Sequence, residues 1–86
     1  MIATIEQLID REARLTLPAR DVTPRADLYR LGLTPYTAIR LLLAIEREFE
    51  VVFPRRLLNR ASMASIEAIM ACLRETTPEQ ELLEAA

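Results

Sequence analysis

Several residue types are scarce or missing in this chain of 86 residues, which has no histidine, no lysine, one glycine and one cysteine. Without histidine it lacks the commonest general base and the commonest metal ligand. A single glycine disfavours a fold built on tight hairpins, whose turns usually need several. Cys72 cannot form an internal disulfide, and its apolar neighbours predict a packed core thiol. We therefore expect a helical protein that is not an enzyme.

Long apolar runs and a dominant charge are also missing. No stretch reaches the ~18 apolar residues of a membrane span, and the first ten residues lack the basic start of a signal peptide. The net charge of −2 comes from 13 acidic residues and 11 arginines mixed along the chain. We therefore expect a cytoplasmic protein without a membrane span, and the charge pattern disfavours a small DNA-binding domain.

The apolar periodicity predicts one all-α domain over residues 1–75 and a tail over 76–86. A first helix is expected over 4–15, with Thr4 and Gln7 at the spacing of a capping box. A long loop over 16–33 follows, with one helical turn at 26–30. The next helix begins with Thr34 as N-cap and Pro35 at its first position, and runs to Phe49.

Three shorter elements complete the predicted order. Pro54 opens a short helix over 54–59, and Ser62 or Ser65 caps a last core helix that carries apolar residues to Leu73. The tail repeats a capping signature at 77–80 and is expected to add a short helix. The fold class is therefore a four-helix bundle with a long first loop and a short third helix.

The helix at 35–49 carries two apolar stripes, one more than a small bundle needs for its own core. One stripe consists of Ala38, Leu41, Leu42, Ile45 and Phe49. The other, which we call the second stripe, consists of Tyr36, Ile39 and Leu43, flanked by Arg40, Glu46 and Arg47. Either the long loop covers the second stripe or a partner protein docks on it, and its position beside the proline at the helix start favours docking.

A continuous run from Asp27 to Pro54 resembles the centre of an acyl carrier protein. That family shows an acidic residue, a short apolar run, Gly-Leu, Asp-Ser-Leu, a long helix ending in Glu-Glu-Phe, and a segment that closes with Pro. The resemblance extends over about residues 4–74 and needs no gap between Asp27 and Pro54. It implies a 4'-phosphopantetheine cofactor, phosphopantetheinyl transferase, and acyl- or aminoacyl-transferring or ligase-type enzymes as partners.

Two departures from the family pattern concern the site itself. Thr34 stands at the family's Asp, and Pro35 stands where the family has its attachment serine. Arg40 and Arg47 replace acidic residues on the long helix, so a partner should differ from those of general fatty-acid synthesis. The resemblance assigns partner contacts to Tyr36, Ile39, Arg40, Leu43 and Arg47.

Three interpretations of Pro35 remain open at this stage. The domain has lost the arm and acts through protein contacts, or a neighbouring hydroxyl of Thr34 or Thr37 accepts the arm, or proline replaces a natural serine. In the family, a helix start suits the phosphodiester of the arm, because its N–H groups and dipole favour an anion. The main alternative function is a helical adaptor or dimerisation module, with no tie to acyl transfer, that uses the second stripe.

Overall fold

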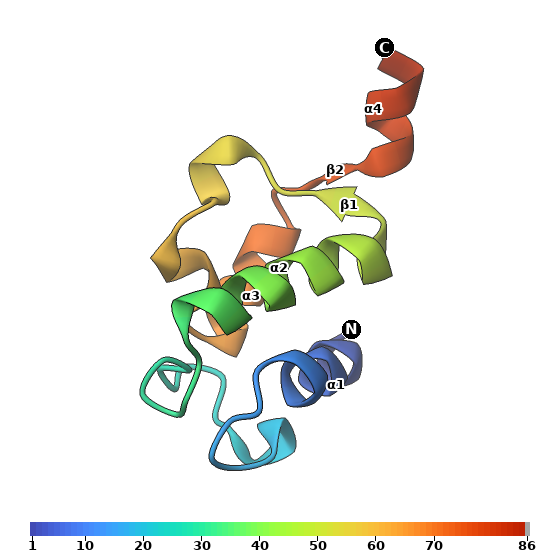
Figure 1. Cartoon of the computed structure of the whole chain (residues 1–86). Helices are drawn as coiled ribbons and strands as arrows, with labels where there is room; N and C mark the ends of the chain where they lie inside the picture. Colours follow the sequence, from blue (N-terminus) through green and yellow to red (C-terminus); the bar gives the residue numbers. More distant parts are fainter. Residues whose placement is uncertain (86) are drawn as a thin grey trace.

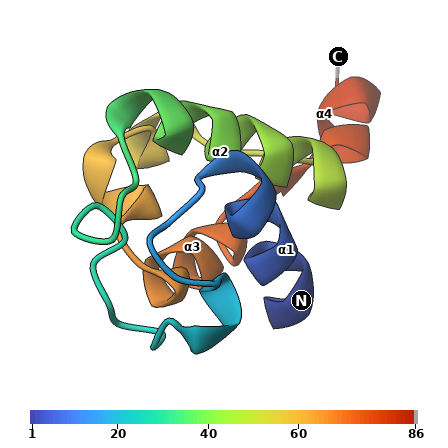
Figure 2. The same ribbon diagram turned by 60° about the horizontal axis from the view of Figure 1, so that its bottom comes forward.

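The computed structural model describes residues 1–85, and its core is a bundle of three helices. The helices are α1 (Ile2–Glu12), α2 (Pro35–Phe49) and α3 (Ile66–Leu73). In Figures 1 and 2, α2 lies across α1 and α3, with the long first loop passing beneath its N-terminal end. Together with the short third helical segment described below, this arrangement confirms the predicted helical bundle.

The core is formed where the inner faces of these helices meet. Ile5 and Ile9 of α1, Leu41 and Ile45 of α2, and Ile69 of α3 are fully buried. Fully burying one such side chain contributes roughly 1.5–3 kcal/mol. Cys72 is buried as well, which confirms the predicted core thiol.

The first helix differs from the prediction at both ends. It begins at Ile2 with Met1 as N-cap and no side-chain capping bond, so Thr4 lies inside the helix. It ends at Glu12 instead of residue 15 because Arg14 adopts a left-handed conformation with φ 49°. The Asp10 carboxylate then accepts a hydrogen bond of 2.8 Å from the Ala19 N–H, which turns the chain into the loop.

The loop between α1 and α2 is long, as predicted, but its helical turn lies elsewhere. A 3₁₀ turn, η1, occupies Ala19–Asp21, and residues 26–30 form hydrogen-bonded turns without a helix. Leu28 is fully buried, and its backbone N–H donates to the Ala64 carbonyl at 2.8 Å. The loop is therefore anchored to the bundle through its backbone and one apolar side chain.

The segment between α2 and α3 consists of two 3₁₀ turns, η2 (Arg55–Leu57) and η3 (Arg60–Met63), in place of one short helix. Pro54 precedes η2, and the Asn59 side chain accepts a hydrogen bond from the Ser62 N–H at the start of η3. Of the two serines considered as caps for the last core helix, Ser65 is the cap, since its Oγ accepts from the Ala68 N–H at 3.0 Å. Ser62 is buried.

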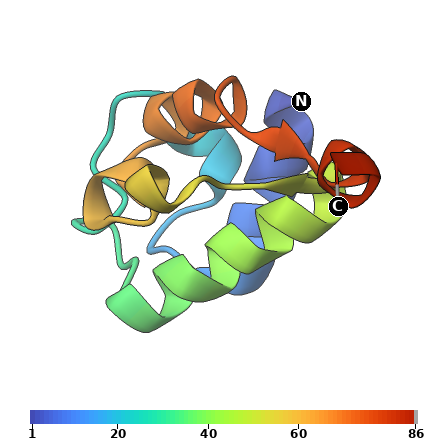
Figure 3. The ribbon, with the colours of Figure 1, turned by 90° about the horizontal axis from the view of Figure 1, so that it is seen from above.

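The tail is attached through a small sheet that the sequence did not predict. Strand β1 (Val51–Val52) pairs antiparallel with β2 (Thr77–Pro78), and α4 (Glu79–Ala85) follows directly. Figures 1 and 3 show α4 projecting beyond the C-terminal end of α2, away from the three-helix core. The predicted tail helix is confirmed, and the pairing of β1 with β2 ties the tail to the end of α2.

Candidate attachment site and docking surface

The start of α2 is fixed by a reciprocal capping box between two threonines. Thr34 Oγ1 accepts from the Thr37 N–H at 3.1 Å, and Thr37 Oγ1 accepts from the Thr34 N–H at 2.8 Å. The two hydroxyl oxygens lie 2.9 Å apart, and Thr37 Oγ1 also lies 3.2 Å from the Thr34 carbonyl oxygen. Thr34 is thus the N-cap, as predicted, and the cap residue at the third position is Thr37 instead of the usual Glu or Gln.

Pro35 occupies the first position of α2, between the two capping residues. Its missing N–H is not needed there, and its fixed φ suits the first helical turn. It offers no hydroxyl, while both threonine oxygens are engaged in the cap. The residues at this helix start therefore do not fit a covalent phosphopantetheine arm, which needs a hydroxyl nucleophile at position 35.

A groove opens beside Pro35 between α2 and the η2–η3 segment. Its volume is about 680 Å³, and apolar side chains form most of its wall, among them Pro35, Ala38, Leu42, Val52, Phe53, Leu58 and Met63. Of its polar residues, Glu46 holds the far wall in place, because its carboxylate accepts from the Phe53 N–H at 2.8 Å. The groove is thus open and mostly apolar, it has Pro35 in its wall, and Ile39 and Leu43 of the second stripe line it as well.

Tyr29 and Arg60 form the polar part of the groove wall. The Arg60 guanidinium carbon lies 3.7 Å from the centre of the Tyr29 ring, within the range of a cation–π contact. The Tyr29 hydroxyl donates to the Arg60 carbonyl at 3.0 Å. Partial burial raises the pKa of Tyr29 above its usual value near 10, and the nearby Arg60 charge opposes that shift. The pair joins the long loop to η3.

The second stripe lies on the surface of α2 and is not covered by the long loop. Tyr36, Ile39 and Leu43 are exposed by 67%, 62% and 51%, whereas Leu41 and Ile45 on the opposite face are fully buried. At 100° per residue Tyr36, Arg40, Leu43 and Arg47 fall along one line of the helix. The interpretation that the loop covers this stripe is therefore wrong.

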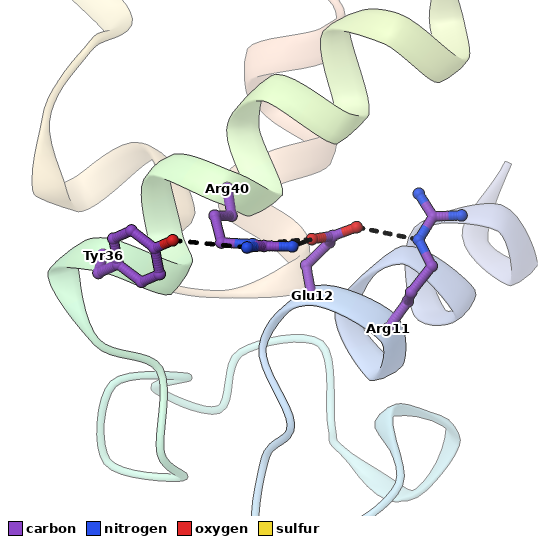
Figure 4. A network of polar contacts seen from close by, with 4 residues as sticks. All are labelled: Arg11, Glu12, Tyr36 and Arg40. Carbon is purple, nitrogen blue, oxygen red and sulfur yellow. Dashed lines mark hydrogen bonds and ion pairs between the residues drawn. The ribbon is translucent and has the colours of Figure 1, made fainter.

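Arg40 is held in place by a network that reaches across to α1 (Figure 4). Its guanidinium donates to Glu12 Oε1 at 3.1 and 3.2 Å, contacts the Tyr36 hydroxyl at 3.5 Å, and lies 5.9 Å from the Tyr36 ring centre. The second Glu12 oxygen accepts from Arg11 at 2.9 Å. The hydrogen bond from Arg11, with a further contribution from Arg40, lowers the pKa of Glu12 below its usual value. The Tyr36 hydroxyl and Glu12 raise the pKa of Arg40.

The two arginines beside the second stripe differ in how far their charges are compensated. Glu12 is only 12% exposed at its side chain and partly neutralises Arg40, which lies with a 53% exposed side chain. Arg47 is exposed and has no ion pair within residues 1–85. The stripe therefore presents apolar side chains with one compensated and one uncompensated positive charge.

Sequence reasoning did not find Glu12, Tyr29 or Arg60 as members of the site. Glu12 is 28 residues from Arg40, and Tyr29 is 31 residues from Arg60. No local spacing joins such pairs, because the contacts depend on how α1 and η3 pack against α2.

Within residues 1–85 no three Cys, Asp or Glu side chains gather into a group that could hold a metal ion. Over the same range no helix is both long and apolar enough to cross a membrane.

Known proteins resemble this chain in sequence and in fold. An aminoacyl carrier protein of Agrobacterium fabrum is 42% identical over 69 residues, which cover 80% of this chain and 83% of the relative. A chain in the crystal structure of an engineered Bradyrhizobium japonicum glycine:[carrier protein] ligase, complexed with a carrier protein from Agrobacterium tumefaciens and AMP, superposes with a TM-score of 0.83. That match is 39% identical and covers 86% of this chain and 99% of the other.

A solution structure of a protein from Agrobacterium tumefaciens matches the whole chain as well, with 37% identity and a TM-score of 0.68. The family model described as a phosphopantetheine attachment site matches residues 3–73, which include α2, α3, all of α1 except Ile2, and the residues that line the groove. The chain therefore belongs to the phosphopantetheine attachment site family of carrier domains.

Proposed function

We propose that this protein is a carrier-type domain that docks with aminoacyl-transferring enzymes of the ligase class but does not take the phosphopantetheine arm at Pro35. It works without catalysing a reaction itself, in the cytoplasm. Residues 1–75 form the docking domain and residues 76–86 the tail. The observation that supports the proposal is a carrier-type fold in which Pro35 opens α2, the position that the resemblance assigns to the attachment serine.

The geometry at the start of α2 supports the loss of the arm. A transferase needs a hydroxyl that can reach its coenzyme A substrate, and position 35 offers only the proline ring. Thr34 and Thr37 would each have to leave the capping box to react, which exposes unpaired backbone N–H groups. Losing such a cap costs ~1 kcal/mol of stability. Of the two interpretations that take Pro35 as the natural residue, a disarmed carrier agrees better with these contacts than an arm on Thr34 or Thr37.

The exposed second stripe supports docking. Large apolar side chains that stay exposed together on one helix of a small domain mark an interaction surface. Tyr36, Ile39 and Leu43 provide the apolar contact, and Arg40 and Arg47 provide charge. The matched chain comes from a structure of a ligase with a carrier protein, so a ligase of this class is the partner that we propose.

Intact-mass measurement tests the state of position 35. The protein and a Pro35→Ser variant are each incubated with coenzyme A and a phosphopantetheinyl transferase of broad specificity. We expect only Pro35→Ser to gain the mass of the arm. If the unchanged protein also gains it, a disarmed carrier is refuted, and Thr34→Val and Thr37→Val then identify the acceptor. If neither protein gains the mass, the transferase does not recognise the start of α2 as an attachment site, and the carrier interpretation of this site is wrong.

Binding to the glycine:[carrier protein] ligase of Bradyrhizobium japonicum tests the docking surface. Ile39→Asp places a charge in the stripe and should weaken binding by about tenfold or more, as for a central interface residue. Ile2→Asp is the matched control, since Ile2 is also exposed but lies on α1. Equal affinity of both variants would exclude docking through the stripe. Concentration-dependent dimers that use the stripe, together with no binding to the ligase, would favour the adaptor alternative.

A further inference from the structure

The tail helix α4 is acidic and exposes two leucines. It contains Glu79, Glu81 and Glu84, and no basic residue. Leu82 is 44% exposed and Leu83 is 71% exposed. At 100° per residue, Glu79 lies between the two leucines on one face of the helix. This face combines a carboxylate with apolar area and has no covering element in the described chain.

The attachment of α4 fixes where it begins but leaves its leucines uncovered. The Glu79 N–H donates to the Glu50 carbonyl at 2.9 Å, directly after the β1–β2 pairing. Leu83 lines a cleft with Phe49 and Glu50 at the end of α2 and yet stays mostly exposed. In Figures 1 and 3, α4 stands apart from the three-helix core.

The second stripe of α2 is complementary to this face in both charge and polarity. It presents Tyr36, Ile39 and Leu43 as apolar contacts, with Arg40 and the unpaired Arg47 on the same side of the helix. Two acidic residues of α2 lie near this face. Glu46 is beside Ile39, about 100° around the helix from Arg47, and its carboxylate accepts a hydrogen bond from the Phe53 N–H. Glu48 lies about 120° from Tyr36 on the other side, so the positive charge that an acidic partner meets is that of Arg47. An acidic helix with adjacent leucines is therefore the kind of ligand that this stripe fits.

We propose that α4 of one copy docks on the second stripe of another copy of this chain. Leu82 and Leu83 pack against Leu43 and Ile39, and Glu79 lies near Arg47. The contact joins two different surfaces, so it closes into a dimer when two copies exchange their tails and otherwise adds further copies.

The structure shows no docking of α4 on the stripe of its own copy. The helix starts beside Glu50 and projects away from α2 (Figures 1 and 3). Leu43, the nearest stripe residue, lies about 10 Å back along α2, and Ile39 and Tyr36 lie about 16 and 21 Å back, at 1.5 Å per residue. Because α4 is itself only about 10 Å long and points away from them, contact with the stripe of another copy needs no change in its attachment.

The association has a functional consequence that does not depend on the identity of the enzyme partner. A copy whose stripe holds a neighbour's α4 cannot present that stripe to an enzyme. The seven-residue helix provides much less than the ~1,200 Å² of a stable interface, so self-association is weak and yields to a better partner. The tail therefore acts as a competitor for the docking face at high protein concentration.

Mixed-copy NMR tests the proposal directly. A copy that carries a spin label at Glu84→Cys is mixed with an isotope-labelled copy without a spin label, and buried Cys72 is not available for labelling. We expect the label to broaden amide signals of α2 around residues 36–47 and to leave α3 unaffected. Because the label and the observed nuclei are on different copies, only association between copies gives this pattern. Broadening that is absent, or spread evenly over the chain, would overturn the proposal.

Three variants identify the contact by sedimentation of the full chain. Leu83→Asp should weaken self-association by about tenfold, and Arg47→Glu by about two- to fivefold, as for an exposed ion pair. Combining Arg47→Glu with Glu79→Arg should restore most of the self-association that Arg47→Glu alone removes. If the charge exchange does not restore association, the proposed pairing is wrong. Leu83→Asp should still bind the ligase, so failure of this proposal is distinguishable from failure of docking.

Discussion

Alanine substitutions on the two faces of α2 should change the free energy of unfolding by very different amounts. Ile45 is fully buried among core residues, and Ile45→Ala removes its outer carbons and leaves a cavity. Large-to-alanine changes at such positions cost about 2–5 kcal/mol. Leu43 lies two residues away on the same helix and is half exposed. Leu43→Ala loses little buried area, and we expect a cost of about 0.5 kcal/mol or less.

Urea unfolding followed by circular dichroism measures both variants against the unchanged protein. Native domains are stable by only about 5–15 kcal/mol, so Ile45→Ala should shift the midpoint strongly while the slope stays constant. Both substitutions have nearly the same helix propensity effect, which makes Leu43→Ala a matched control. A cost above about 1.5 kcal/mol for Leu43→Ala would refute the exposed position of the second stripe, and with it the docking surface.

Further predictions concern pH, caps and backbone. Because the folded pKa of Glu12 is lowered, its contribution to stability is present above its unfolded pKa near 4.5 and is lost as pH falls through the folded pKa. Glu12→Gln should therefore flatten the fall in thermal stability below pH ~4.5 and leave a smaller difference in acid than at neutral pH. Ser65→Ala removes the cap of α3 and should cost ~1 kcal/mol in urea unfolding, and an unchanged midpoint would exclude a capping role. Glu50 has φ 53°. Glu50→Gly should therefore stabilise by about 0.5–1 kcal/mol, while Glu48→Gly inside the helix should destabilise by ~1 kcal/mol, and equal effects in urea unfolding would contradict the left-handed cap.

The sequence predicted α2 and α3 well because local signals determine them. Thr34, Pro35 and Ser65 mark the helix starts through capping chemistry that acts within three residues. Periodicity likewise separated the buried face of α2 from the second stripe. The start of α1 was mispredicted because the spacing of Thr4 and Gln7 matches a capping box without forming one. Its end depends on the left-handed Arg14, which no pattern indicates.

Contacts between residues far apart in the sequence could not be predicted, because they depend on how the elements pack. The pairing of β1 with β2 joins two-residue strands too short to show alternation, and the Glu12–Arg40 contact depends on how two helices pack. Because Glu12 opposes Arg40, reversing the charge with Arg40→Glu should disturb the contact between α1 and α2.

The capping box at the start of α2 has one further consequence. Thr34 and Thr37 hold the first turn through hydrogen bonds that involve no atom of residue 35. Position 35 is exposed at the mouth of the groove, and serine is compatible with the first turn of a helix as proline is. In the proposed function, a carrier that takes the arm and a disarmed one therefore differ at a single side chain, and the capping box can hold the first turn in both. Evolution can pass between the two states in either direction without first rebuilding the fold.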